Sequence, residues 1–110
     1  MPTLTGRRVA TLDDIQQPGD YAGPDEIVHQ GAEIETRQQV WFLLPLHEGE
    51  TKYDRPTAAS GLHAVSSPPW MFHECADGSL RIEGSIACGR DSKIGEYFHG
   101  WLEEGHTWHW

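Results

Sequence analysis

The sequence predicts a single small all-β domain: an antiparallel sandwich or partly open barrel of six or seven short strands, with a coil or short helix at the N-terminus. Three observations predict it. Apolar and polar residues alternate from Leu80 to Cys88, the dipeptide Asp77-Gly78 is a strong hairpin signal, and a second glycine-containing hairpin ends the chain. A chain of 110 residues with 37% hydrophobic residues suits one domain, residues 1–110, with one core.

The first hairpin is expected across residues 70–88. Asp77 and Gly78 as the central residues of a type I′ turn place Cys75 opposite Leu80. The even-numbered residues from Leu80 to Cys88 are apolar or small, so this strand is expected to be half-buried, with its even positions facing the core.

The same register separates the two cysteines. Cys88 lies eight residues beyond the position opposite Cys75, roughly 26 Å along an extended strand, which is outside disulfide reach. We therefore expect two unpaired thiols in the core, unless Gly84 bends the strand sharply.

The second hairpin spans residues 97–110 and leaves two registers open. Glu104-Gly105 as a two-residue loop sets Trp101 opposite Trp108, whereas a three-residue loop sets His99 opposite His109. The tryptophans either cap the core or form a contact surface, since interface centres are rich in Trp and Tyr. The residues predicted to bind a partner in the second case are Tyr97, His99, Trp101, Trp108 and Trp110.

Upstream, the apolar run of residues 40–44 predicts a central strand ended by Pro45. Residues 27–35 suggest a partner strand interrupted at Gly31, and residues 61–65 suggest a further short strand. Residues 1–26 are expected to be irregular, with at most one helical turn, and residues 46–60 to form a surface loop.

Charge limits the classes of partner. Seventeen acidic against eight basic residues give a formal charge of -9, which disfavours direct nucleic-acid binding. The acids form either a solvated surface or a nucleic-acid mimic that occupies a host factor's basic groove. The sequence shows neither a signal peptide nor an apolar run long enough to cross a membrane, so we expect a cytoplasmic protein that binds no membrane.

A metal site is a further alternative. His73, Cys75, His99 and His106 offer a ligand set that zinc accepts, but their spacing matches no standard zinc motif. Buried structural His and Cys are the default interpretation, and no cofactor is expected. The standard catalytic motifs are absent, and His47 and Glu48, adjacent on an extended segment, point to opposite sides. The sequence therefore does not predict an enzyme.

The chain contains the following motifs, in this order: PGDY, VWFLLP, LHAVSSPPW, DGSL followed by SI, and YFHGWLEEGHTW. In this order the chain resembles a family of small proteins of unassigned activity encoded by actinobacterial phages and prophages. The resemblance implies a phage accessory protein that binds a host or phage protein in the host cytoplasm, and it leaves virion association open. Related phage proteins often carry a cysteine near the histidine of the HG element or a cysteine pair near the N-terminus. Here Phe98 precedes His99 and the N-terminus lacks cysteine, which weakens the zinc interpretation.

Overall fold

A computed structural model describes residues 3–30, 33–45, 62–88 and 98–110. The expected surface loop at residues 46–60 lies outside these ranges. None of the described helices is long and apolar enough to cross a membrane. The elements of the described ranges are β1 (Thr3–Thr5), β2 (Arg8–Val9), the 3-10 helix η1 (Leu12–Asp14), β3 (Tyr21–Gln30), β4 (Ile34–Leu43), β5 (Leu62–Ser67), β6 (Met71–Glu74), β7 (Leu80–Glu83), β8 (Ile86–Cys88), β9 (Phe98–Glu103) and β10 (Thr107–His109).

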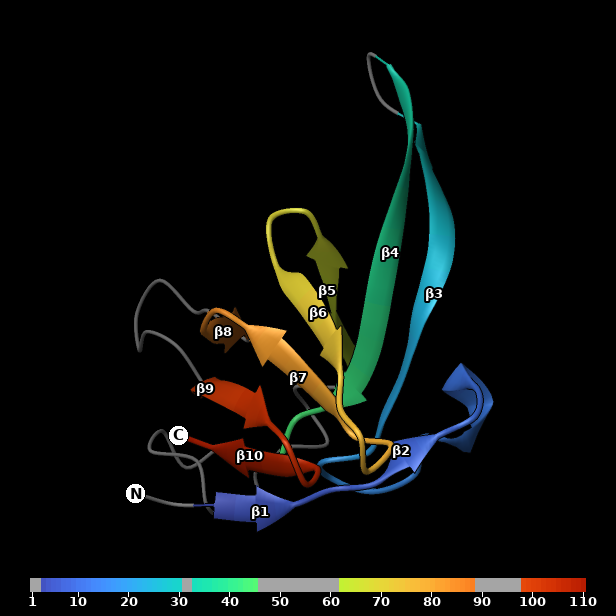
Figure 1. The fold of residues 1–110 in the computed structure, drawn as a ribbon. Coiled ribbons are helices and arrows are strands. Elements are labelled where there is room, and N and C mark those ends of the chain that lie inside the picture. Colours follow the sequence, from blue (N-terminus) through green and yellow to red (C-terminus); the bar gives the residue numbers. More distant parts are fainter. Residues whose placement is uncertain (1–2, 31–32, 46–61, 89–97) are drawn as a thin grey trace, which may run out of the picture.

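The strands form two four-stranded sheets and a two-stranded ribbon, in the orders β1-β10-β9-β8, β2-β3-β4-β5 and β6-β7 (Figure 1). All described pairs are antiparallel except β2 with β3. Short connections carry β1 of one sheet into β2 of the other, and β7 of the ribbon into β8. These mostly antiparallel sheets confirm the predicted all-β class.

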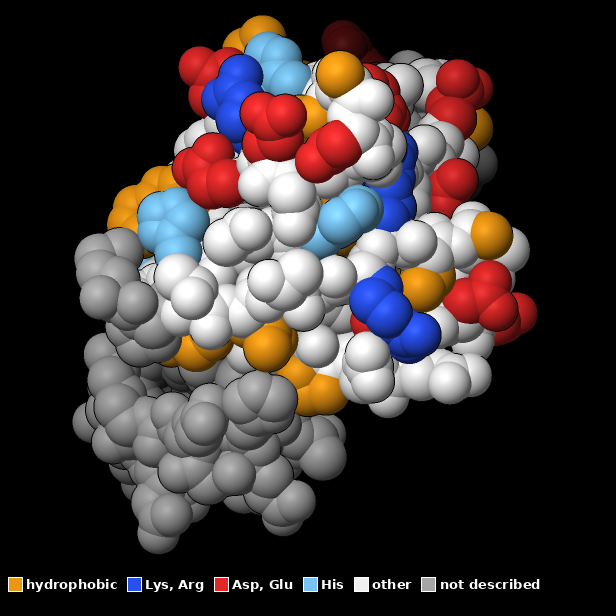
Figure 2. Space-filling model, turned by 60° about the horizontal axis from the view of Figure 1, so that its bottom comes forward, with side chains coloured by type: hydrophobic (Ala, Val, Ile, Leu, Met, Phe, Trp, Pro, Cys, Tyr) orange, Lys and Arg blue, Asp and Glu red, His pale blue; other side chains and the backbone are white. Residues whose placement is uncertain are grey.

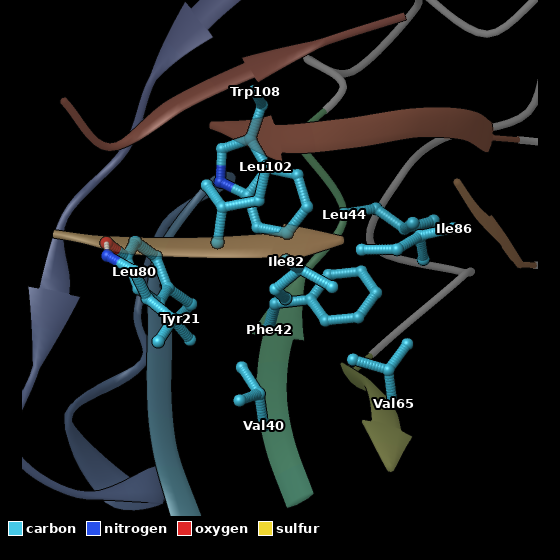
Figure 3. Close-up of a cluster of buried hydrophobic side chains, with 10 residues drawn as sticks. All are labelled: Tyr21, Val40, Phe42, Leu44, Val65, Leu80, Ile82, Ile86, Leu102 and Trp108. Atoms are coloured by element: carbon cyan, nitrogen blue, oxygen red, sulfur yellow. Dashed lines mark hydrogen bonds between the residues drawn. The ribbon is translucent and has the colours of Figure 1, made fainter. Parts of the chain in front are cut away.

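One hydrophobic core joins the three sheets (Figure 3). The inward positions follow the two-residue period of a strand: Val40 and Phe42 on β4, and Leu80 and Ile82 on β7, are buried. Ile86 on β8 is buried as well, so the predicted inward orientation holds for Leu80, Ile82 and Ile86, whereas Gly84 is exposed at the bend between β7 and β8. The buried cluster consists of Tyr21, Val40, Phe42, Leu44, Val65, Leu80, Ile82, Ile86, Leu102 and Trp108.

The N-terminal segment differs from the expectation of an irregular chain over residues 1–26. The helix η1 is the predicted short helical turn, but β1 pairs with β10, β2 pairs with β3, and β3 begins at Tyr21. Strands of three and two residues are too short to show an alternation of their own. Their hydrogen-bond partners lie far away in the sequence, so only the tertiary structure reveals them.

A buried carboxylate closes the loop that leads from β2 into β3. Asp20 is fully buried; its oxygens accept hydrogen bonds from the Arg7 guanidinium at 2.9 and 2.7 Å and from the amides of Gln16 and Gln17 at 3.0 and 3.1 Å. Burial alone would raise the pKa of Asp20, but these donors hold that pKa below its ordinary value. The charged carboxylate therefore stabilises the turn that aligns β2 with β3.

Residues 40–43 of the predicted run belong to β4, which lies between β3 and β5 and is central as predicted, and Leu44 follows the strand. The expectation of one interrupted strand over residues 27–35 is wrong, because the chain reverses between Gln30 and Ile34. β3 and β4 are instead the two strands of one long hairpin (Figure 1).

The register of the β6–β7 hairpin differs by one residue from the prediction. Glu74, not Cys75, lies opposite Leu80. The Cys75 amide donates to the Ser79 carbonyl at 2.9 Å, so the loop contains three residues and ends in Gly78, whose φ is +85°. The Asp77 carboxylate accepts from the Ser79 amide at 2.9 Å, an Asx-type contact that favours the longer loop.

A bend at Gly84 divides the predicted strand from Leu80 to Cys88 into β7 and β8. Gly84 has a φ of +111°, a conformation that side chains rarely adopt. A Cβ atom there would also approach the Trp70 indole to 3.2 Å. The Trp70 Nε1 donates to the Ser85 carbonyl at 3.0 Å, which holds the indole across the bend.

Candidate functional site

The C-terminal hairpin adopts neither of the two predicted registers. Leu102 lies opposite Trp108, and Trp101 lies opposite His109. The loop between β9 and β10 therefore contains residues 104–106. This register places Leu102 and Trp108 on the inner face of the sheet and Trp101 and His109 on its outer face.

The loop residue His106 is held by the core. Its φ is +59°, which is uncommon outside glycine but tolerated by histidine. The Tyr21 hydroxyl lies 2.6 Å from the His106 Nδ1 and accepts a hydrogen bond from the Leu80 amide at 3.2 Å. Burial raises the pKa of Tyr21, so its hydroxyl stays protonated. This arrangement occupies Nδ1 and fixes the hairpin turn against β3.

The inner face of the hairpin belongs to the core. Trp108 is fully buried, and its Nε1 donates to the Gly19 carbonyl at 2.9 Å. Its ring centroid lies 5.1 Å from that of Phe42. Trp110 is partly buried and packs against the same cluster. The core interpretation therefore holds for these two tryptophans, and the prediction of Trp108 as a contact residue is corrected because its indole is out of reach of a partner.

The outer face carries three stacked rings, which we call the aromatic row: His99, Trp101 and His109. The Trp101 centroid lies 5.0 Å from that of His109, with 12° between the planes, and 5.7 Å from that of His99, with 21° between the planes. His99 is exposed, and the other two are partly buried. The near-parallel planes hold the three rings together as one group on this face.

Glu103 extends this surface. It lies on the same side of β9 as Trp101, and its Oε1 is 3.4 Å from the His109 Nε2. The same outer face includes Thr3 of β1, which pairs with His109, and Ala87 of β8, which pairs with His99. The predicted contact residue Tyr97 lies outside the described residues.

Sequence reasoning missed His109 and Glu103 because it chose the wrong register. Pairing the two most apolar residues around the turn, Leu102 and Trp108, would have given the observed alignment. That pairing moves Trp108 inward and His109 outward at once, because a one-residue slip exchanges the two faces of a strand.

The four residues of the zinc alternative do not converge. His73 Nε2 lies 2.8 Å from Glu83, His106 contacts Tyr21, and His99 stacks on Trp101. Cys75 was expected in the core, but it is a free thiol that is only half-buried. Across the described ranges, no group of three or more His, Cys, Asp or Glu residues is arranged to hold a metal ion. The side chain of Cys88 and residues His47 and Glu48 lie outside the described part of the chain.

The nucleic-acid mimic requires acids gathered on one face. Several described acids are instead paired with cations or histidines, as in Asp20 with Arg7 and Glu74 with Arg8. Figure 2 shows acidic side chains lying between histidine and basic side chains on the face in view. These pairings do not favour mimicry over an ordinary solvated surface.

Comparison of the chain with protein-family models, curated proteins and solved structures gives no match. The aromatic row and the chemistry of its neighbours are therefore the basis for a functional conclusion. The group on this sheet face consists of three rings, threonine hydroxyls and the Glu103 carboxylate.

Proposed function

We propose that this chain is a phage-encoded accessory protein that acts by binding another protein, without catalysing a reaction. The contact surface is the outer face of the sheet β1-β10-β9-β8, centred on the aromatic row of His99, Trp101 and His109. The observation that carries the proposal is the stack itself: three rings ordered on a sheet face whose opposite side already supplies the core.

The physical support for this surface is that binding through these rings loses little conformational entropy. A tryptophan stacked with two imidazoles has lost part of its rotamer freedom before a partner arrives, so less entropy is lost on binding. Tryptophan is also among the residues that most often dominate interface energetics. The neighbouring threonines and Glu103 supply the polar rim that surrounds such a centre.

The phage assignment is supported by the order of sequence motifs, from PGDY to YFHGWLEEGHTW. We place the protein in the host cytoplasm, where its partner is a host or phage protein. The charge of -9 makes nucleic acid an unfavourable partner.

The test compares three immobilised full-length chains in extracts of actinobacterial cells, infected and uninfected: the parent chain, Trp101→Ala, and Met71→Ala. Met71 is 55% exposed on β6, outside the sheet that carries the row, and serves as the matched control. We expect a protein that the parent and Met71→Ala chains retain equally and that Trp101→Ala retains at about one tenth of that level or less. Equal retention by Trp101→Ala, at unchanged folding, would refute the contact surface.

A further inference from the structure

The far half of the β3–β4 hairpin projects beyond the rest of the molecule as a two-stranded arm (Figure 1). β2 pairs only with Tyr21 and Ala22 of β3. Within the described ranges, the outer edge of β3 at residues 25–30 has no strand beside it. Alternate residues of this edge direct their backbone N–H and C=O groups away from β4, where an added strand could pair with them.

The arm also exposes apolar side chains. Val28 is 60% exposed and Ile34 is 76% exposed. Ile34 shares its face with Val40 and Phe42, so the core-facing side of β4 continues into solvent past the end of the core. A two-stranded ribbon is marginally stable in water, and a third strand would cover part of this surface.

The negative charge of the arm favours a partner segment that carries basic residues. Residues 25–37 contain four acids and one basic residue, Arg37, which is already paired with Glu35. The β3 edge at residues 25–30 contains two acids and neither lysine nor arginine. Pairing this edge with a second copy would bring together carboxylates that no basic residue balances, and nucleic acid is disfavoured for the same reason.

The order of residues along this edge specifies a pattern. Asp25 and Glu26 are followed by Ile27 and Val28, and each face of the ribbon receives one acid and one apolar residue. An antiparallel strand that reads two apolar residues and then two basic residues would place the apolar pair against Val28 and Ile27 and the basic pair against Glu26 and Asp25.

We infer that the open edge of β3 is a second binding site, which takes an extended segment of a partner protein with two apolar residues followed by two basic residues. The site lies on a different sheet from the aromatic row. It holds or fails independently of the function proposed above.

The probe is a capped peptide, Thr-Thr-Val-Ile-Lys-Lys-Thr-Thr, titrated into the isotopically labelled full-length chain and followed by amide NMR shifts and hydrogen exchange. We expect shifts confined to the arm and protection of every second amide between residues 25 and 30, because alternate amides of a strand face one edge. The reversed peptide, with Lys-Lys before Ile-Val, should bind about tenfold more weakly.

The decisive variant is the double substitution Asp25→Lys with Glu26→Lys. It should lose about tenfold in affinity for the lysine peptide and regain it for a peptide in which both lysines are replaced by glutamates. Glu104→Lys, at an exposed position of the β9–β10 loop, reverses one charge outside the arm and should leave binding unchanged.

Four outcomes would overturn the inference. They are the absence of arm shifts at millimolar peptide, equal binding of the reversed peptide, an equal loss in Glu104→Lys, and a self-association of the free chain that the arm variant abolishes. The last would make a second copy the occupant.

Discussion

Trp101 and Trp108 lie on opposite faces of the same hairpin, and their substitution by alanine should have opposite consequences. Trp108 is fully buried between β4 and the N-terminal loop, with its Nε1 bonded to the Gly19 carbonyl. A buried tryptophan removes about 200 Å² from water, worth about 5 kcal/mol at 25 cal/mol/Å². Loss of the hydrogen bond leaves a carbonyl unsatisfied at a cost of about 1 kcal/mol more.

Relaxation around the cavity recovers part of this sum, and we expect Trp108→Ala to lose about 4–5 kcal/mol of unfolding free energy. A domain of this size has about 5–15 kcal/mol in total, so this variant should be marginal or unfolded. Trp101→Ala, on the outer face, should lose only about 1 kcal/mol. Trp108→Phe keeps a ring but removes the donor to Gly19, and should lose about 2 kcal/mol.

Urea unfolding followed by far-UV circular dichroism measures these differences without depending on tryptophan fluorescence. With a slope of about 1–3 kcal/mol/M, Trp108→Ala should move the midpoint by about 1.3–5 M, and Trp101→Ala by about 0.3–1 M. The reasoning fails if Trp108→Ala loses less than about 2 kcal/mol, or if Trp101→Ala loses as much as Trp108→Ala.

Three further perturbations test other parts of the structure. Because the pKa of Asp20 is lower in the folded than in the unfolded state, its contribution to stability is complete above about pH 4 and is lost as the pH falls through the folded pKa. Asp20→Asn should therefore lower the free energy of unfolding by about 2–4 kcal/mol at pH 7 and flatten the acid limb of a Tm-against-pH curve. Gly84→Ala should lower the free energy of unfolding in urea by about 2–3 kcal/mol, because the new Cβ requires a positive φ and approaches the indole of Trp70. Gly78→Ala also requires a positive φ but has open space around its Cβ, so it should lower that free energy by about 1 kcal/mol. His63→Leu should raise thermal stability by about 1 kcal/mol, since the His63 Nε2 is buried and has no hydrogen-bond partner among the described residues.

Each of these has a contrary result. An unchanged acid limb in Asp20→Asn would show that the carboxylate does not drive acid unfolding. Equal losses at Gly84 and Gly78 would place the whole cost in backbone conformation and none in the indole contact. A lower Tm for His63→Leu would mean that the imidazole contributes more by packing on Phe42, 6.1 Å away between centroids, than its unsatisfied nitrogen costs.

The aromatic site shows where prediction from sequence stops. The density of Trp and His in residues 97–110 is a local property that indicates this hairpin, and Gly105 indicates its turn. Which rings face outward depends on one residue of register, and that register is set by contacts outside the hairpin. The Trp108 indole reaches Gly19, and the Tyr21 hydroxyl holds His106, across 89 and 85 residues of sequence.

The sequence alone determined that the chain is all-β, that Leu80, Ile82 and Ile86 point inward, and that residues 40–43 form a central strand. These features follow from the two-residue period of extended chain and from the local preferences of glycine and proline, both of which act over a few residues. Only the tertiary structure decided that β1 and β2 exist, that Gly84 divides a strand between two sheets, and that His109 stacks beside Trp101. Each of those depends on hydrogen bonds and packing between segments that are distant in the chain, and a local pattern carries no information about such partners.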